Sequence, residues 1–345
     1  MNPTVLASLS MTLMTSTISV MLCHHWLLAW VALELNTLSM LPIMIKQHSP
    51  RATEAATKYF LIQATGAAML LFAGTMTAWQ TGQWNITCTT ETPATMMFTM
   101  AVLLKLGLAP MHLWYPEILQ GSTMMTALLI STWQKIAPLS LLYSTTPALP
   151  TKTLMLFGLL SALLGGLTGL NQTQTRKIMA FSSLAHMGWL LTTINSNPGL
   201  ATLTFILYTT MTSSMFIALN MNTTNSLSNL NTTWSYSPVL LTTTMLTLMA
   251  LGGLPPLTGF MPKWLILKEL TQNGLTTLSA TLALASLPSL FFYTRTAYMT
   301  TLTLPPAPTN TPHKWRFKTQ HQQLHATLIT MTTMLLPLVP LILTT

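Results

Sequence analysis

The sequence is poor in charge and contains no aspartate. Its 345 residues include 14 lysines and arginines and 5 acidic residues, so 6% of the residues are charged, against roughly 25% in an ordinary soluble domain. The acidic residues are all glutamates: Glu34, Glu54, Glu91, Glu117 and Glu269. A soluble protein of this length needs a charged surface, which this composition cannot supply. The chain is therefore expected to be a membrane protein.

Several kinds of binding site are also missing. The two cysteines, Cys23 and Cys88, stand on separate segments without the spacing of metal ligands. The sequence has no glycine-rich nucleotide loop, CxxC pair or haem-type histidine pair, so no bound NAD, flavin, iron–sulfur cluster, haem or metal is predicted. The net charge is +9, but the basic residues are scattered between apolar runs. They form no basic helix or aromatic RNA-binding box, which argues against nucleic acid as a partner.

Long apolar segments make up most of the chain. A bilayer core takes about 20 mostly apolar residues of helix, and the sequence predicts about 11 such spans. They lie at about 3–22, 26–45, 59–79, 95–119, 124–143, 152–170, 177–196, 199–220, 238–267, 275–299 and 322–343. Many contain threonine, whose hydroxyl can bond to a carbonyl one turn back. Basic residues gather after even-numbered spans, which predicts an N-terminus on the negative side of the membrane and a C-terminus on the other.

A few charged side chains fall inside spans. Glu34, Lys105 and Lys135 each lie roughly 12–17 Å from the nearer end of a span, close to the midplane of a core about 30 Å thick. A charge at that depth costs about 2.5–3.5 kcal/mol on insertion scales, and such residues commonly mark ion or proton pathways. Snorkelling or a static ion pair are the alternatives. One glutamate, however, cannot pair with three lysines when Lys263 is counted, so the sequence favours a proton relay.

Two histidines accompany these charges. His186 lies at the same predicted depth, and His112 follows Lys105 in the same span. Each could belong to the relay or could simply bond to a neighbouring helix, and the sequence leaves both interpretations open. Burial favours the neutral form of a lysine and a nearby carboxylate favours its charged form, so a change in their separation would move a proton. No redox catalytic residue is predicted.

Two spans contain matching interruptions. GLAPMHLWYP at 107–116 and GLPPLTGFMP at 253–262 share glycine, leucine and prolines, and Pro110, Pro255 and Pro256 are predicted to break the helices. Such breaks are tolerated in a membrane only against protein or water. The two spans cross in opposite directions, which is typical of inverted repeats in transporters.

The predicted fold is therefore an all-α polytopic membrane protein with two discontinuous helices. Residues 1–345 form a single membrane domain, with five-helix repeats at 1–145 and 150–300 and an extra helix at 322–343. In the span at 152–170, Gly165 and Gly169 form a small-xxx-small pattern, which predicts close helix packing.

Several segments resemble a known family. HHWLLAWVALELNTLSMLPIM, KLGLAPMHLWYPEILQG, WQKIAPLSLLY, NQTQTRKIMAFSSLAHMGW and GGLPPLTGFMPKW are similar to the antiporter-like, proton-translocating membrane subunits of respiratory complex I, the mitochondrial NADH–ubiquinone oxidoreductase. That family is related to Na⁺/H⁺ antiporter subunits. Its members usually have 14 spans, and the animal mitochondrial member lacks the first three, in agreement with the count above.

The resemblance implies roles for the buried charges. Glu34 matches the glutamate that pairs with the broken-helix lysine, here Lys105. Lys135 matches a central-axis lysine, and Lys263 matches the lysine of the second broken helix. The two histidines lie on the same hydrophilic axis. The second repeat has no buried acid to match Glu34.

The resemblance also implies a biochemical setting. The chain would be a subunit of an enzyme that couples NADH oxidation to proton translocation, with NADH, FMN, iron–sulfur clusters and ubiquinone bound by other subunits. Its partners would be those subunits and membrane lipid. It would lie in the mitochondrial inner membrane with the N-terminus on the matrix side and the C-terminus on the intermembrane side. A free-standing cation/proton antiporter and a purely structural subunit are the alternatives.

Overall fold

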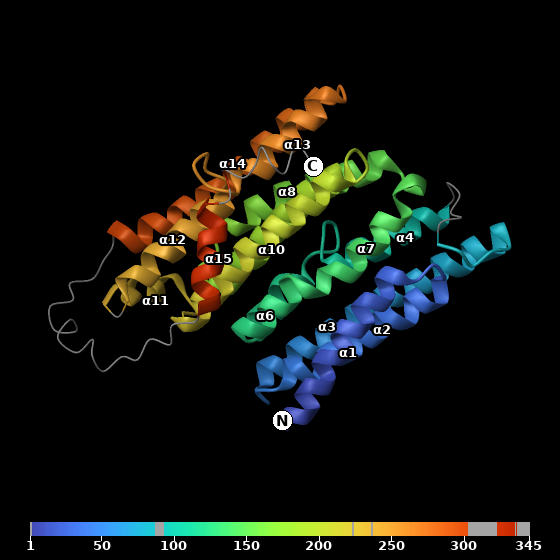
Figure 1. Cartoon of the computed structure of the whole chain (residues 1–345), viewed down its shortest axis with the longest axis horizontal. Helices are drawn as coiled ribbons and strands as arrows, with labels where there is room; N and C mark the ends of the chain where they lie inside the picture. Colours follow the sequence, from blue (N-terminus) through green and yellow to red (C-terminus); the bar gives the residue numbers. More distant parts are fainter. Residues whose placement is uncertain are drawn as a thin grey trace. The chain divides into compact units, whose positions relative to one another are not determined.

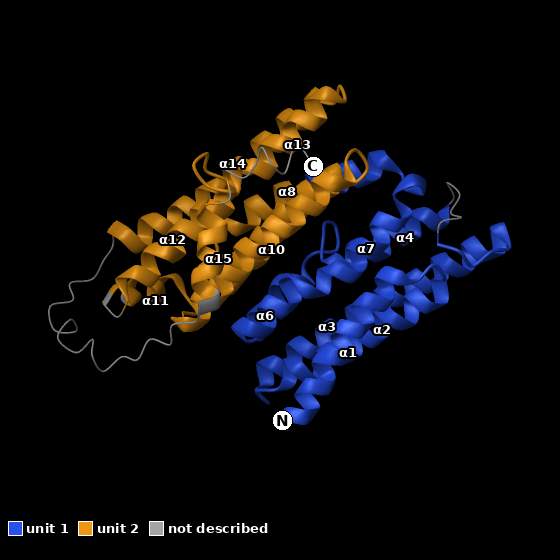
Figure 2. Cartoon of the chain, viewed as in Figure 1, with its two compact units in different colours: residues 1–160 blue, residues 161–345 orange. Residues whose placement is uncertain are grey.

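The described part of the chain is helical throughout. The computed structural model describes residues 2–86, 93–222, 224–235, 237–302, 323–334 and 336, and within these ranges it contains helices and 3-10 turns but no β-strand longer than an isolated bridge. The helices divide into two compact units, Met1–Leu160 and Ser161–Thr345 (Figure 2). This division falls inside α8 (Thr151–Gly169). The repeat boundary expected from the sequence lies at 145–150, and the repeats themselves remain a prediction.

The first unit is built around three consecutive long helices (Figure 1). α2 contacts both α1 and α3, α3 also contacts α4 and α5, and α7 contacts α1 and α4. The elements are α1 (Pro3–Leu22), α2 (Trp26–Ile45), α3 (Pro50–Thr81), α4 (Pro93–Leu106), α5 (Trp114–Gly121), α6 (Met124–Ser131), the 3-10 turn η1 (Trp133–Lys135), α7 (Ile136–Thr145) and the 3-10 turn η2 (Thr146–Ala148).

In the second unit, α10 contacts α9, α12, α13 and α15, and α14 contacts α9, α11, α12 and α13. A buried apolar cluster around Trp189, Ile266 and Leu282 joins α9, α13 and α14. After α8 the elements are α9 (Thr175–Thr193), α10 (Pro198–Met221), α11 (Leu227–Thr232), the 3-10 turn η3 (Thr233–Ser235), α12 (Pro238–Gly252), α13 (Phe260–Gln272), α14 (Thr276–Leu302) and α15 (Gln323–Met334).

Helix length and composition fit a multi-pass membrane protein. Six helices in the described part of the chain, α1, α2, α3, α8, α10 and α14, are long and apolar enough to cross a bilayer, and α4 and α12 are shorter apolar helices. The predicted total of about 11 spans remains a prediction. The threonines behave as expected. For example, the hydroxyl of Thr244 donates to the carbonyl of Leu241 at 2.7 Å, so it is not left unpaired in an apolar helix.

Three elements differ from the sequence prediction. α3 begins at Pro50 rather than near residue 59, because the Ser49 hydroxyl caps it by accepting a hydrogen bond from the amide of Ala52. The span at 124–143 is divided by η1, and α11 lies in the expected loop at 221–237. The C-terminal helix is described only over Gln323–Met334, and the rest of the predicted 322–343 span lies outside the described residues.

Gly165 confirms the close packing predicted from the small-residue pattern. A Cβ atom added at this position would lie 2.7 Å from the backbone nitrogen of Ala185 and 2.9 Å from the carbonyl oxygen of Phe181. α8 and α9 are therefore so close here that no side chain fits between their backbones. Gly169, one turn on, faces the ring of Phe292, with a 3.0 Å approach for an added Cβ.

Candidate functional site

Both proline-containing blocks interrupt a helix in the structure. α4 ends at Leu106 and α5 begins at Trp114, while α12 ends at Gly252 and α13 begins at Phe260. Each interruption starts with a glycine in the left-handed region, Gly107 with φ 71° and Gly253 with φ 81°. Glycine reaches this conformation without steric cost, which is why it commonly ends a helix. Pro110 lies in the first interruption, and Pro255 and Pro256 lie in the second.

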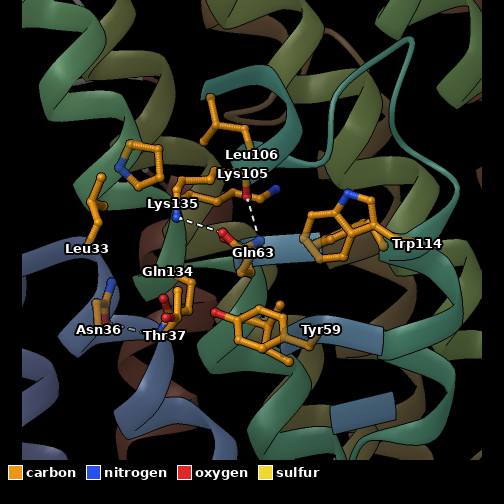
Figure 3. A pocket seen from close by; sticks show the side chains of 13 residues that line it. Leu33, Asn36, Thr37, Tyr59, Gln63, Lys105, Leu106, Trp114, Gln134 and Lys135 are labelled. Atoms are coloured by element: carbon orange, nitrogen blue, oxygen red, sulfur yellow. Dashed lines mark hydrogen bonds between the residues drawn. The ribbon is translucent and has the colours of Figure 1, made fainter. Parts of the chain in front are cut away.

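Lys105 occupies the last turn of the first half-helix. Its side chain is 6% exposed. The Lys105 ammonium donates to the backbone carbonyl of Gln63 on α3 at 3.3 Å, and the Gln63 amide donates back to the carbonyl of Lys105 at 3.4 Å (Figure 3). A cation near the C-terminal end of a helix is stabilised by the helix dipole. Gln63 therefore fixes both the backbone and the ammonium of Lys105.

Glu34 supplies the nearby negative charge. It lies half-buried on α2, where the Thr37 hydroxyl donates to its backbone carbonyl at 2.8 Å and lies 3.3 Å from its carboxylate. The carboxylate attracts the Lys105 ammonium electrostatically. The two groups do not form a direct ion pair, because the ion pairs found among the described residues join Lys58 to Glu54 and to Glu117.

Lys135 stands in the 3-10 turn that divides α6 from α7. Its side chain is 3% exposed, and its ammonium lies 5.0 Å from the centre of the Tyr115 ring, within the range of a cation–π interaction. The preceding residue, Gln134, donates from its amide to the side-chain oxygen of Asn36 at 3.3 Å. This bond joins the Lys135 turn to α2, the helix that carries Glu34.

The two lysines line one internal cavity (Figure 3). It offers about 20 Å³ for the centre of a water molecule, slightly more than the roughly 10–15 Å³ that one water needs. Polar groups on its wall could bond such a water: Asn36, Thr37, Tyr59, Gln63, Lys105, Tyr115, Gln134 and Lys135. The first unit thus brings Lys105 and Lys135 to one water-sized polar space, and Glu34, which acts on Lys105 electrostatically, is not among its lining residues.

In the second unit Lys263 follows the interruption, whereas Lys105 precedes the one in the first unit. Lys263 comes from the first turn of α13 and reaches back to the end of α12, where its ammonium donates to the carbonyl of Gly252 at 2.8 Å. A Cβ atom on Gly253 would stand 3.0 Å from that ammonium nitrogen, so the glycine also makes room for the lysine. The ammonium therefore lies against the negative end of the α12 dipole.

His186 shares a cavity with Lys263. The cavity again offers about 20 Å³ and is lined by both residues together with Thr204 and Tyr208. The His186 ring lies half-buried, with its centre 5.7 Å from that of Tyr208. The second unit thus places an imidazole, a lysine, a phenol and a hydroxyl around one small space.

His112 belongs to the first interruption itself. It is 7% exposed, and its Nδ1 lies 3.2 Å from the carbonyl oxygen of Pro110. A carbonyl only accepts, so Nδ1 carries the proton and donates. His112 is not among the residues that line the Lys105–Lys135 cavity. The structure therefore connects it with the shape of the break rather than with the cavity.

Sequence reasoning missed the polar residues that hold the lysines. Gln63, Asn36 and Gln134 are amides within apolar helices, and Tyr115 and Tyr208 are tyrosines in the same setting. The signal available was weak, since amides and tyrosines are common at helix contacts in membranes. In the described ranges no group of three or more histidine, cysteine or carboxylate side chains is placed to hold a metal ion.

Interrupted apolar helices that each bring a lysine to a small cavity are typical of ion-translocating membrane proteins. The chain matches the family model described as NADH:quinone oxidoreductase/Mrp antiporter, transmembrane, over residues 23–288, and that of the NADH dehydrogenase subunit 2 C-terminus over residues 290–343. It is 52% identical to NADH-ubiquinone oxidoreductase chain 2 of Carassius auratus over 100% of this chain and 99% of that protein. The same chain of Struthio camelus is 50% identical, with 99% of each covered. The chain belongs to the NADH-ubiquinone oxidoreductase chain 2 family.

Solved structures share the fold. A chain of respiratory complex I from Thermus thermophilus, solved with bound aureothin, superposes with a TM-score of 0.79 at 25% identity, covering 96% of this chain and 78% of that one. A chain of the Mrp complex from Dietzia sp. gives a TM-score of 0.80 at 14% identity, with 97% and 75% covered. At that identity the second match shows the fold alone.

Proposed function

We propose that this chain is a proton-translocating membrane subunit of a respiratory NADH-ubiquinone oxidoreductase. The observation that carries the proposal is the placement of Lys105 and Lys135, both buried, on one water-sized polar cavity with the Glu34 carboxylate close by. Membership of the chain 2 family over the whole length supports the assignment to a respiratory NADH-ubiquinone oxidoreductase. NADH, FMN, iron–sulfur clusters and ubiquinone would be bound by other subunits, and the chain would lie in the mitochondrial inner membrane with its N-terminus on the matrix side.

In the proposed mechanism a lysine ammonium exchanges its proton through water held in its cavity. The Glu34 carboxylate favours the charged form of Lys105 while the two residues remain close. Separation of the two residues, or neutralisation of Glu34, favours release of the proton from Lys105. Lys135, on the same cavity, is the proposed next carrier. In the second unit Lys263 and His186 would exchange protons in the same way across their own cavity. His112 would act by holding the break in shape.

Replacing Lys105 or Lys135 by methionine tests this proposal. Methionine keeps the length of the side chain and removes the ionisable group. In the assembled complex reconstituted into vesicles, each variant should lower the number of protons moved per electron. Lys152→Met, at an exposed lysine at the start of α8, is the matched control. Normal pumping by both buried-lysine variants would refute the relay and leave a structural role.

A free-standing antiporter is the second candidate, since the fold is shared with a chain of an Mrp complex. Purification distinguishes the two. The proposed subunit should copurify with other hydrophobic chains and NADH-oxidising activity, whereas a free antiporter should be stable alone or as a homodimer.

A further inference from the structure

A large apolar cavity in the first unit is separate from the lysine cavity. It has a volume of about 300 Å³ and lies between the first half of α1, the end of α2, and the α6–η1 segment. Its wall is mainly aliphatic and sulfur-containing, with Leu6 and Met14 from α1, Leu129 from α6 and Trp133 from η1. A cavity of this size and character fits a hydrocarbon chain and would be costly to fill with water.

The length of the cavity matches the hydrocarbon thickness of one leaflet of a bilayer. From Leu6 to Met14 the α1 side of the cavity runs about 12 Å, and from Thr123 to Trp133 the other side runs about 15 Å, at 1.5 Å per helical residue. Half of a hydrocarbon core is about 15 Å. Both helices run in the same direction, away from the end where the N-terminus lies (Figure 1). The cavity therefore extends from the end of the unit to near mid-depth.

A positive charge stands at the outer end. Lys46 is the C-cap residue of α2, lines the cavity and is exposed. Over the residues that the structure describes, no ion pair or hydrogen bond of its ammonium is found. The nearby Thr123 and Thr126 hydroxyls bond to each other at 3.0 Å, so they are satisfied. Lys46 is thus placed to bind an anionic group at the mouth of an apolar cavity.

We propose that this cavity binds one acyl chain of an anionic glycerophospholipid, with the lipid phosphate bound by Lys46. A hydrocarbon chain complements the apolar wall and a phosphate complements the charge of Lys46 at its mouth, whereas an apolar helix of another protein would leave that charge without a counter-charge. The outer face of α1 is also apolar and exposed, with Met11 60% and Ile18 52% exposed, as expected of a surface in contact with hydrocarbon. The proposal is independent of the proton pathway.

Photolabelling of the assembled complex tests the site. The complex is reconstituted into phosphatidylcholine vesicles that contain phosphatidylglycerol with a diazirine in one acyl chain, illuminated and digested for mass spectrometry. Label is expected on peptides covering residues 6–14 and 123–133. Lys46→Gln should lower this labelling about fivefold, because one lysine near a membrane surface contributes about 1 kcal/mol to binding of anionic lipid. Lys152→Gln, which removes an equally exposed lysine beside another helix end, should leave it unchanged.

A cavity-filling variant provides the second arm. Leu129→Trp adds bulk to the wall and should abolish labelling of both peptides while phosphatidylglycerol remains in the vesicles. Equal labelling by phosphatidylcholine with the same diazirine chain would overturn the role of Lys46, as would equal loss in the two lysine variants. Cross-links from these peptides to another protein chain, without lipid adducts, would show that a partner helix fills the cavity and would overturn the proposal. Lys46 is exposed, so its variant keeps the test valid if Leu129→Trp fails to assemble.

Discussion

Replacing Gly253 by alanine should uncouple the second unit, and Gly274→Ala provides a matched comparison. Both glycines are left-handed, with φ 81° and 77°. An alanine in that conformation costs about 1–2 kcal/mol, so both variants should lose that much stability. Nothing lies within 4 Å of a Cβ on Gly274, whereas a Cβ on Gly253 would stand 3.0 Å from the Lys263 ammonium nitrogen and 3.1 Å from its Cδ.

The added methyl group should displace the flexible end of Lys263 by a few tenths of an ångström or more, away from the Gly252 carbonyl that it now meets at 2.8 Å. A hydrogen bond from a charged group contributes about 1.5–3 kcal/mol, so part of that stabilisation is lost as well. The assay measures electron transfer and protons moved per electron in reconstituted complex. Gly274→Ala should lower only the thermal stability, and Gly253→Ala should also lower the proton-to-electron ratio. Identical ratios in the two variants would refute the assigned role of Lys263.

Three further changes test other parts of the structure. Gln63→Leu removes the side-chain amide that donates to the Lys105 carbonyl, so it should lower the free energy of unfolding by about 1 kcal/mol. It should also reduce proton pumping more than electron transfer, and unchanged pumping would contradict a positioning role for Gln63. Gly165→Ala places a methyl group against the rigid backbone of α9, which should lower the free energy of unfolding, followed by thermal unfolding, by about 1–3 kcal/mol. Gly199→Ala should lower it much less, because the nearest atom to the added Cβ lies 3.4 Å away. Lys58→Ala breaks two exposed 2.8 Å ion pairs, so melting and pumping should both stay close to those of the unmodified complex, and a large loss of pumping would reveal a role for this charge.

The boundaries of several elements could be predicted because their signals are local. α1 and α2 begin and end at the predicted residues, since apolar runs of fixed length are enough to define them. The two interruptions follow from glycine and proline in the same short block. The 3-10 turn at Lys135 was not predicted from the sequence, although Pro138, three residues further on, is a local signal for it. Proline has no amide hydrogen to donate to the carbonyl four residues back, and its ring crowds that carbonyl, so the helix tightens there.

The lysine surroundings could not be predicted, because they depend on how each helix is rotated about its axis. Gln63 and Lys105 are 42 residues apart, and Asn36 and Gln134 are 98 residues apart. No local pattern relates positions at those separations. The buried charges themselves were identifiable because the sequence has so few, but the amides that position them are chemically ordinary among many polar residues. For His112 the sequence left a relay role and a structural role open, and in the structure its Nδ1 lies 3.2 Å from the Pro110 carbonyl oxygen.

The two units stabilise a lysine ammonium in different ways, and the difference follows from the scarcity of acidic residues. In the first unit the Lys105 ammonium lies near the Glu34 carboxylate, a group that can itself gain a proton. In the second unit Lys263 lies against the last carbonyl of α12, and a helix dipole has a fixed charge that does not titrate. Protonation of Glu34 would therefore change the field at Lys105, whereas the α12 dipole at Lys263 stays fixed. If both lysines carry protons, the first site responds to the charge of its acid, and the second responds to movement of the α12–α13 break or to a proton on His186, which lines the same cavity.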